Sequence, residues 1–170
     1  MTDHERAMLL SVRPRYAESI LAGGKRVEIR RQRPSITPGT PVIIYATKPV
    51  GAVVGTAIID RVRPGTPSEL WAHYQEEMGI TQDEFDQYVG DLTTAYLLLL
   101  TDASRLPIPL TLSDMRESAD FQPPRSYRYL SHNSLRALVN GHPARAPLLS
   151  LLQRHATHSQ DLARACAEAL

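Results

Sequence analysis

The sequence predicts an α+β protein: a small mixed β-barrel with surrounding helices, followed by a helical C-terminal extension. The chain has 170 residues, which fits one domain with an appended element. Short runs rich in β-branched residues alternate with helical patterns over residues 1–130. Over residues 131–170, leucine and alanine recur at helical spacing without a strand signal. We therefore expect a barrel-like domain at 1–130 and an extension at 131–170 that packs on it or mediates association.

The first half of the chain is predicted to be mostly strand. A short apolar run at Ala7–Val12 fits a buried strand. A helix follows, because Pro14 suits the first helical position and Gly23 or Gly24 can adopt the left-handed C-terminal cap. Three more strands are then expected, at 27–30, 41–47 and 52–62.

The second half opens with helical signals. Thr66 and Glu69 have the spacing of a capping box, and Thr81 and Glu84 repeat it. Each of these two helices is expected to end at a glycine. The apolar run at 93–101 then predicts a central strand. A short helix at 111–118 and an extended segment at 121–130 complete the predicted domain.

Positive charge is concentrated in residues 21–34, LAGGKRVEIRRQRP, which hold five basic side chains and a single carboxylate, Glu28. One interpretation is an exposed edge strand, because Lys and Arg commonly protect such edges from aggregation. The other is an anion site, because glycines let a ligand approach the backbone. Arg13 and Arg15 precede the same helix, so its two ends can face one cleft suited to a phosphate or a nucleotide edge.

Composition narrows the classes of function. The formal net charge is +1, so an anion site must come from local clustering. Cys166 is the only cysteine, which excludes an intramolecular disulfide and indicates a reducing compartment. The N-terminal stretch has no signal-peptide core, and the longest apolar run, Ala95–Leu100, is too short to span a bilayer. We expect a cytoplasmic protein with no membrane partner.

No pattern in the sequence predicts a cofactor or a metal. P-loop, G-x-S-x-G and Rossmann motifs do not occur, which disfavours hydride transfer and the usual nucleotide hydrolysis. His155 and His158 are spaced i, i+3 on an expected helix, but no cluster of cysteines or carboxylates accompanies them.

The pattern G-x-K-x-x-E-x-R is formed by Gly23, Lys25, Glu28 and Arg30. Around it, LSVRPRYAESILAGG, VIIYATKPVGAVVG, LW and FQPPRSYRYL follow in the order typical of the ASCH domain family. Over residues 8–130 the chain resembles that family. The resemblance implies a PUA-like fold and an RNA or modified-nucleoside ligand. Similar members deacetylate acetylcytidine, cleave RNA, or are assigned to RNA binding alone.

The resemblance also implies catalytic residues. Deacetylating members use a lysine, a threonine three residues later and a glutamate on a later helix. Lys25 matches the lysine, Glu28 replaces the threonine, and Glu76 is the best candidate for the glutamate, with Glu77 as the near alternative. If Glu28 and Glu76 share a cleft, one can act as general acid while the other activates water. The competing interpretation is an inert ion-pair network.

Further binding candidates lie at strand ends and in the segment PPRSYRYL. Tyr45, Thr47 and Lys48 are placed where a strand meets a turn, although a buried core tyrosine is the alternative for Tyr45. Arg125 and Arg128 alternate with tyrosines, a combination suited to RNA. The expected ligand-binding set is Gly23, Gly24, Arg30, Arg13, Arg15, Tyr45, Thr47, Lys48, Arg125 and Arg128.

Three functions stay open on the sequence alone. The first is binding of RNA or a modified nucleoside, with hydrolysis of an exocyclic amide, as in acetylcytidine, or cleavage of RNA. The second is RNA binding without catalysis. The third is a protein-interaction role of the C-terminal helices, which are also the candidate surface for a homodimer.

Overall fold

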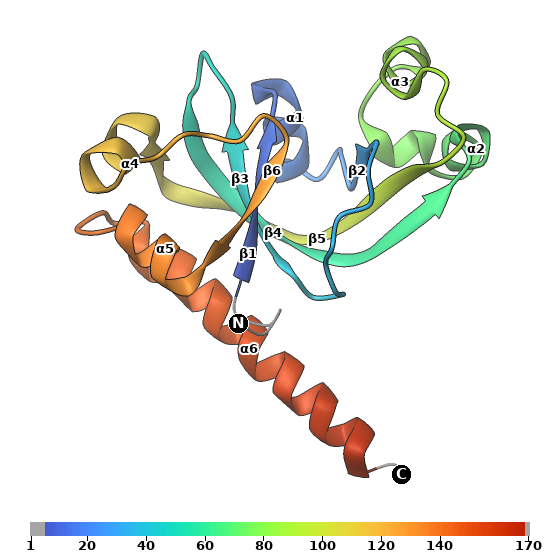
Figure 1. Cartoon of the computed structure of the whole chain (residues 1–170). Helices are drawn as coiled ribbons and strands as arrows, with labels where there is room; N and C mark the ends of the chain where they lie inside the picture. Colours follow the sequence, from blue (N-terminus) through green and yellow to red (C-terminus); the bar gives the residue numbers. More distant parts are fainter. Residues whose placement is uncertain (1–5, 169–170) are drawn as a thin grey trace.

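The computed structural model describes residues 6–168, with the side chains of His158, Ser159 and Leu162 left out. One six-stranded sheet forms its centre (Figure 1). The strands are β1 (Arg6–Val12), β2 (Val27–Arg30), β3 (Pro41–Ala46), β4 (Ala52–Gly65), β5 (Ala95–Thr111) and β6 (Tyr127–Ser131). Their order across the sheet is β2-β5-β4-β3-β1-β6. β1 and β3 pair in parallel and the other neighbours are antiparallel.

This strand order corrects the expectation of a barrel. β2 and β6 are the two ends of the order, and no pairing between them closes the sheet within residues 6–168. The α+β class is confirmed, but the sheet is open. Strand patterns report which segments are extended and do not report whether the first and last strands meet, because that pairing is not local in sequence.

The helices are α1 (Pro14–Leu21), α2 (Pro67–Met78), α3 (Gln82–Val89), α4 (Leu112–Ser118), α5 (His132–Leu138) and α6 (Arg145–Glu168). The predicted capping boxes are confirmed at α2 and α3: Thr66 accepts from the Glu69 amide, and Thr81 accepts from the Glu84 amide. α2 ends at Gly79, which has a positive φ of 63°. This backbone conformation suits glycine, because it has no Cβ to clash.

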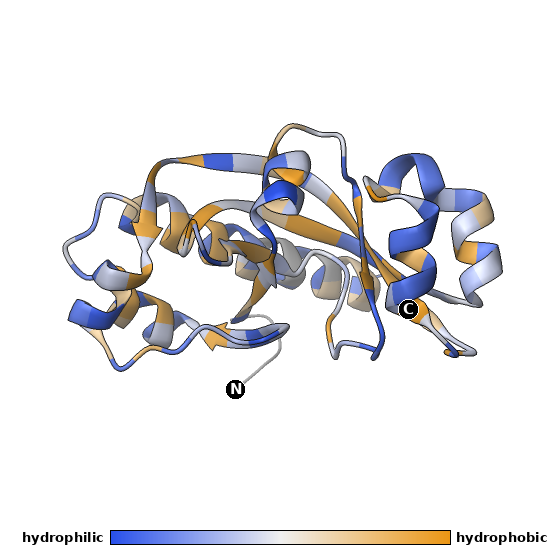
Figure 2. Ribbon diagram, turned by 90° about the horizontal axis from the view of Figure 1, so that it is seen from above, coloured by the Kyte–Doolittle hydropathy of each residue, from blue (hydrophilic) through white to orange (hydrophobic). Residues whose placement is uncertain are grey.

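The core has a layer on each face of the sheet. Alternate residues of β1 enter the two layers: Ala7 and Leu9 face the side of α4, α5 and α6, while Met8 and Leu10 face the side of α1. A third cluster joins β2 and the start of β5 to α2 and α3. In Figure 1, α2 and α3 stand at one end of the sheet and α4 and α5 at the other. Figure 2 shows the apolar residues concentrated along the strands and the inner helix faces.

α1 lies very close to the sheet at Gly55 of β4. A Cβ built on Gly55 would lie 2.4 Å from Leu21 Cδ2 and 2.6 Å from the Ser104 carbonyl oxygen. Glycine is therefore required here mainly by the backbone of β5, because the Ser104 carbonyl cannot rotate away as the end of the Leu21 side chain can.

α6 begins in the core and then leaves it. Leu148 and Leu152 are buried in the same cluster as residues of β1 and β3. Beyond Thr157 the described side chains are exposed, and Figure 1 shows this part of the helix extending away from the sheet. Within the described part of the chain, no helix combines the length and the apolar character needed to cross a membrane.

Candidate functional site

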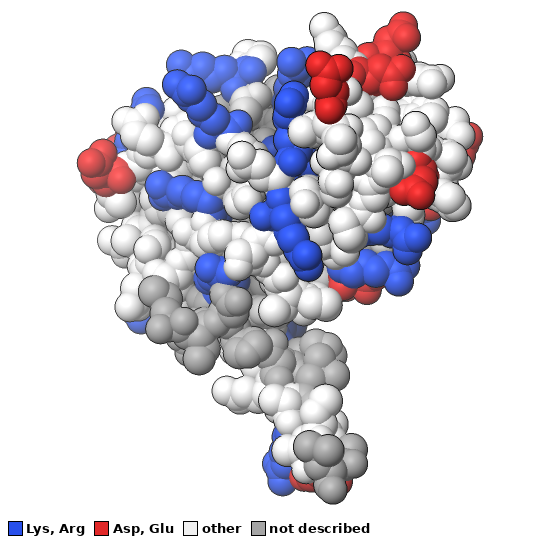
Figure 3. Space-filling view, turned by 45° about the vertical axis from the view of Figure 1, so that its right-hand side comes forward, with Lys and Arg blue, Asp and Glu red and all other residues white. Residues whose placement is uncertain are grey.

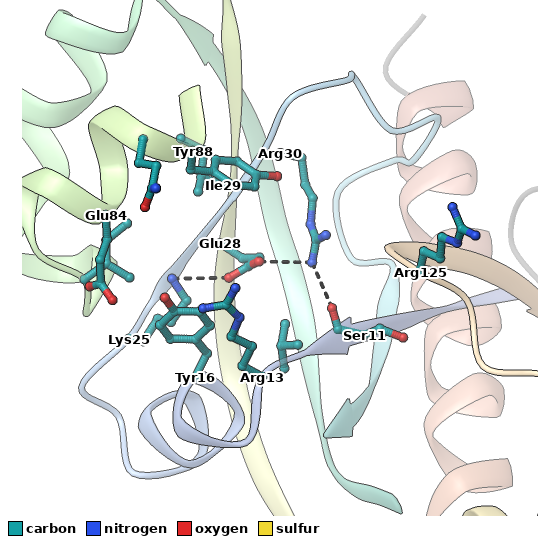
Figure 4. A pocket seen from close by; sticks show the side chains of 13 residues that line it. Ser11, Arg13, Tyr16, Lys25, Glu28, Ile29, Arg30, Glu84, Tyr88 and Arg125 are labelled. Atoms are coloured by element: carbon teal, nitrogen blue, oxygen red, sulfur yellow. Dashed lines mark hydrogen bonds and ion pairs between the residues drawn. The ribbon is translucent and has the colours of Figure 1, made fainter. Parts of the chain in front are cut away.

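A pocket of about 520 Å³ lies where α1, β2 and α3 meet (Figure 4). It contains the buried part of the basic stretch at its base and exposed arginines at its rim. Its lining residues are Ser11, Val12, Arg13, Tyr16, Lys25, Glu28, Ile29, Arg30, Ile80, Glu84, Gln87, Tyr88 and Arg125.

The glycine turn explains how lysine and glutamate of the motif face the same way. β2 begins at Val27, so Lys25 precedes the strand and does not follow its alternation. The Gly24 and Lys25 amides both donate to the Ser19 carbonyl, at 2.9 and 3.1 Å, which folds the turn back against α1. Lys25 and Glu28 are thereby brought together although strict alternation would separate them.

Lys25 is almost fully enclosed, with 2% of its surface exposed. Its Nζ donates to the Met78 carbonyl at 2.6 Å and lies 3.2 Å from Glu28 Oε2. The ammonium also lies 5.4 Å from the centre of the Tyr16 ring, within the range of a cation–π contact.

Glu28 and Arg30 complete a buried charged triad with Lys25. Glu28 Oε1 lies 3.0 Å from Arg30 Nη2, so each carboxylate oxygen has a different cationic partner. Arg30 Nη1 donates to Ser126 Oγ at 2.8 Å, and Nη2 donates to the Ser11 carbonyl at 3.4 Å. The third nitrogen of the Arg30 guanidinium, Nε, is buried and has no hydrogen-bond partner among the described residues. A buried donor without a partner is costly, so the position of this arginine in the pocket is maintained at the expense of stability.

The rim adds charge and aromatic surface. Arg13 and Arg125 are exposed; in Figure 4, Arg13 lies beside Tyr16 and Glu28, and Arg125 stands further away, beyond Ser11. Tyr88 of α3 extends its ring towards Arg30 in the same view. Burial raises the pKa of Tyr88, and Arg30 opposes that rise, so the phenol keeps its proton at neutral pH and is available as a donor.

The acidic residue that α2 and α3 bring to the pocket is Glu84, and the structure places the predicted Glu76 outside the pocket lining. Glu76 is exposed on α2 and is not among the pocket residues, and Glu77 lies 3.9 Å from Arg26 on the outside. Glu84 of α3 lines the pocket and forms an ion pair with Arg15. The Thr81 amide and this arginine together lower the pKa of Glu84. Arg15 therefore contacts the site through Glu84 and does not line the pocket.

Several predicted ligand residues lie elsewhere. Gly23 and Gly24 shape the turn without lining the pocket, and Tyr45 is a core residue with 2% exposure whose pKa is raised by burial. Thr47 and Lys48 are also outside the lining. Arg128 points to the other face of β6, where its guanidinium lies 4.8 Å from the centre of the Phe121 ring.

Among the lining residues that the sequence did not single out are Tyr16, Glu84 and Tyr88. The sequence did contain a partial signal for Tyr16, which shares the helix with Arg13 and Arg15. The capping box accounts fully for a glutamate at position 84, so the sequence contains no separate signal that Glu84 also lines a pocket. Tyr88 has no sequence signal, because its position depends on how α3 packs against β2.

The arrangement is chemically suited to an anion carried on a planar group. A buried guanidinium with a spare donor, two exposed arginines and two tyrosine rings surround one hollow. Arginine binds phosphate oxygens in a planar, multidentate geometry, and tyrosine rings offer stacking surfaces for bases.

Comparisons with known proteins identify the family of this chain. The family model of the ASCH domain matches residues 10–99. The "ASCH domain-containing ribonuclease" of Zymomonas mobilis is 32% identical over 143 residues, covering 82% of this chain and 96% of that protein. The crystal structure of ASCH from Zymomonas mobilis superposes with a TM-score of 0.75 at 30% identity, covering 81% of this chain and 96% of that one.

A more distant likeness is to the large ribosomal subunit protein uL22 of Ureaplasma parvum, 24% identical over 123 residues. That match covers 72% of this chain and 39% of the ribosomal protein. The segment matched by the family model includes Lys25, Glu28 and Arg30, the triad at the base of the pocket. On the family model and on the similarity along most of its length, this chain belongs to the ASCH domain family.

Proposed function

We propose that this protein binds RNA in the pocket at the triad and cleaves it there. The observation that carries the proposal is the Arg30 guanidinium, 8% exposed, whose Nε has no partner and which lies in a pocket also lined by Arg13 and Arg125. A phosphate seated there would accept from Arg30 and from the exposed arginines. The relative named a ribonuclease supports RNA as the source of that phosphate.

The geometry suits the charge that develops during phosphodiester cleavage. When the 2′-oxygen of the RNA attacks the adjacent phosphorus, its proton is lost and the bond from phosphorus to the 5′-oxygen of the next nucleotide breaks, with that oxygen leaving as a hydroxyl after it takes up a proton. The attack places extra negative charge on the non-bridging oxygens, and preorganised arginine donors stabilise it. Glu28 holds both cations of the triad in place, so its main contribution is orientation. The exposed ring of Tyr88 offers a surface for a base next to the phosphate, and one stacked base contributes about 1–3 kcal/mol.

We expect the affinity for RNA to come from a few specific contacts and not from the net charge of the whole molecule. The net charge is +1. Figure 3 shows Lys and Arg side chains distributed over one face of the body and acidic side chains gathered at its border. RNA binding should therefore depend on salt, with a slope set by the small number of arginines that reach phosphates.

Amide hydrolysis of acetylcytidine is the less supported reaction. It was expected to combine Lys25, Glu28 and a helical glutamate, and Glu76 does not line the pocket. Glu28 is engaged by two cations instead of being open to a water molecule. We retain a modified nucleoside as a test ligand, because a pocket of about 520 Å³ has room for one nucleotide. We also keep the proposals that the open sheet is related to PUA-like barrels and that residues 1–130 form the ASCH domain proper.

The test uses the purified full chain with a labelled RNA oligomer and, in parallel, acetylcytidine. Binding is followed by fluorescence anisotropy at several salt concentrations, and products are identified by mass spectrometry. Arg13→Ala and Arg125→Ala should each weaken RNA binding and lower the salt slope by about 1. Arg61→Ala is the matched control, because Arg61 is exposed on β4 and outside the pocket.

Each result has a defined meaning. RNA products that disappear in the pocket variants and persist in the control support the proposal. Binding without products would reduce the function to an RNA-binding module. Conversion of acetylcytidine by a chain that ignores RNA, or equal behaviour of pocket and control variants, would overturn the proposal.

A further inference from the structure

We infer that Lys25 is a positioning residue whose ammonium group fixes the end of α2 and thereby holds the α3 wall of the pocket in place. It would not react with a substrate itself. The inference rests on the proposed function only in naming RNA as the ligand. The clamp between Lys25 and α2 is a property of the protein alone and is tested without RNA.

The hydrogen-bonding capacity of Lys25 is used up within the protein. An ammonium group has three N–H donors. The Met78 carbonyl at 2.6 Å, Glu28 Oε2 at 3.2 Å and the face of the Tyr16 ring surround it from three elements. At 2% exposure, little of the side chain is open to a substrate atom. In Figure 4 the ammonium of Lys25 points to Glu28.

The C-terminal end of α2 is a favourable position for a cation. The last carbonyl groups of a helix lack partners within it and carry partial negative charge, so a nearby cation is stabilising. α2 has no basic residue in its own last turn. Lys25 supplies the missing cation from the motif turn, and the Arg26 amide adds a second contact by donating to the Glu77 carbonyl at 2.8 Å.

Gly79, the C-terminal cap of α2, packs closely against the side chain of Lys25. A Cβ on Gly79 would lie 3.0 Å from Lys25 Cβ, and its φ of +63° already disfavours a side chain. The helix end and the lysine stem are therefore in direct contact. The next residue, Ile80, lines the pocket, and Glu84 and Tyr88 follow on α3. Whatever holds Gly79 in place also holds this wall.

The experiment follows the wall directly in the absence of ligand. Hydrogen–deuterium exchange of residues 79–88 is compared between the natural chain, Lys25→Met and Gly79→Ala. Gly79→Ala leaves the charge of Lys25 intact and disturbs both the left-handed cap of α2 and the contact of that cap with the lysine stem. Both variants are expected to raise the exchange rate of this segment by about tenfold. Trp71, the only tryptophan, lies 5.0 Å from the Phe85 ring centroid, so its emission reports the same packing.

RNA binding and cleavage are then measured on the same variants, with Lys25→Arg as the conservative replacement. If Lys25 positions the wall, Lys25→Arg keeps a cation at the helix end and retains activity that Lys25→Met loses, and Gly79→Ala loses about tenfold in RNA affinity. A residue that reacts with substrate would not be rescued by arginine, because the two side chains differ in acid–base chemistry.

The two proposals fail in different ways. The positioning role would be overturned if Lys25→Met lost RNA cleavage while hydrogen exchange at residues 79–88 and Trp71 emission stayed as in the natural chain. If Lys25→Met does not fold, Gly79→Ala decides alone: unchanged exchange and unchanged emission contradict the clamp. A natural chain that neither binds nor cleaves RNA removes the proposed function, while the exchange and fluorescence results still decide the role of Lys25.

Discussion

Glu28 is the residue on which the site depends most. It is 7% exposed and lies between Lys25 and Arg30, so the triad holds one more positive than negative charge below the surface. Buried charges are tolerated when each has a partner at good geometry. Removing the carboxylate would leave two cations facing each other without compensation.

Replacement of Glu28 by glutamine should therefore destabilise the fold. Breaking a buried ion pair by removing one partner typically costs about 3–5 kcal/mol. We expect a loss of this order in the free energy of unfolding from urea denaturation. Glu76→Gln is the control, since Glu76 is exposed and surface changes usually stay within about 0.5 kcal/mol. Equal midpoints for the two variants would contradict the structural role of the triad.

At the residue scale, the motif supplies the base of the pocket, while Glu76 lies outside it. Lys25, Glu28 and Arg30 lie within six residues, and the turn against Ser19 brings Lys25 to the side of Glu28 that strand alternation alone would not predict. The position of Glu76 follows from the periodicity of α2: Leu70 and Met78 are buried, eight positions apart on one face. Glu76 lies two positions before Met78 and therefore points away from that face.

Among the elements, α3 contributes most to the pocket beyond the motif. Its capping box is built by Thr81 and Glu84, and Glu84 also pairs with Arg15 from α1. One carboxylate thus starts a helix and ties it across the pocket mouth to a second helix. The hydrogen bond from the Thr81 amide is the main cause of the lowered pKa of Glu84, and Arg15 adds to it.

This lowered pKa predicts a pH dependence. Because the folded-state pKa of Glu84 lies below its unfolded value, its contribution to stability is fully present above about pH 4.5 and is lost as the pH falls through the folded-state pKa. The melting temperature of Glu84→Gln should therefore fall less steeply on acidification than that of the natural chain. Differential scanning calorimetry between neutral and acidic pH measures this. Parallel curves for both proteins would contradict the assignment.

Element boundaries were predictable where the signal was local. Both capping boxes and the helix after Pro14 are confirmed, because caps depend on residues within one turn. β5 is longer than its apolar run and continues through Pro107 and Pro109 to Thr111. The two prolines fall between Arg105 and Leu110, where no pairing with β4 is recorded, so their missing amide protons interrupt no ladder bond. Such a gap depends on the partner strand and is not visible in the sequence of β5.

On the scale of the whole molecule, the C-terminal region is divided. Leu135 and Leu138 of α5, and Leu148 and Leu152 of α6, belong to the same core as β1 and β3. In α6 beyond Thr157, the described side chains are exposed and do not belong to that core. The first part completes the fold, and the second part is the surface on which the predicted homodimer would form.

Two truncations separate these parts. A chain ending at residue 157 should keep its melting temperature, because the side chains described beyond that point are exposed. A chain ending at residue 130 should not fold, because it loses several buried leucines, each contributing roughly 2–5 kcal/mol. Circular dichroism measures folding. Analytical ultracentrifugation of the full chain and of the chain ending at residue 157 tests for the dimer. A stable fold at residue 130 would refute the shared core, and concentration-independent monomers would remove the dimer prediction.

The overall architecture was predictable as an order of elements but not as a closed or open sheet. Each strand was found near its expected position, since apolar alternation is a local property. Neighbouring strands in the sheet are partly distant in sequence: β2 pairs with β5, and β1 pairs with β6. Those pairings depend on the total packing of the molecule, so no single segment contains them.

The bare backbone at Gly55 lies beneath the helix that supplies part of the pocket wall. Tyr16 belongs to α1 and Arg13 is its N-cap, while Leu21, at the other end of the helix, has Cδ2 only 2.4 Å from where a methyl group on Gly55 would stand. Alanine at position 55 would also meet the Ser104 carbonyl oxygen at 2.6 Å, so Leu21 must rotate and β4 and β5 must shift to admit it. Position 55 is therefore a place from which the range of ligands can be altered, through a displacement of α1, while every residue that lines the pocket stays the same.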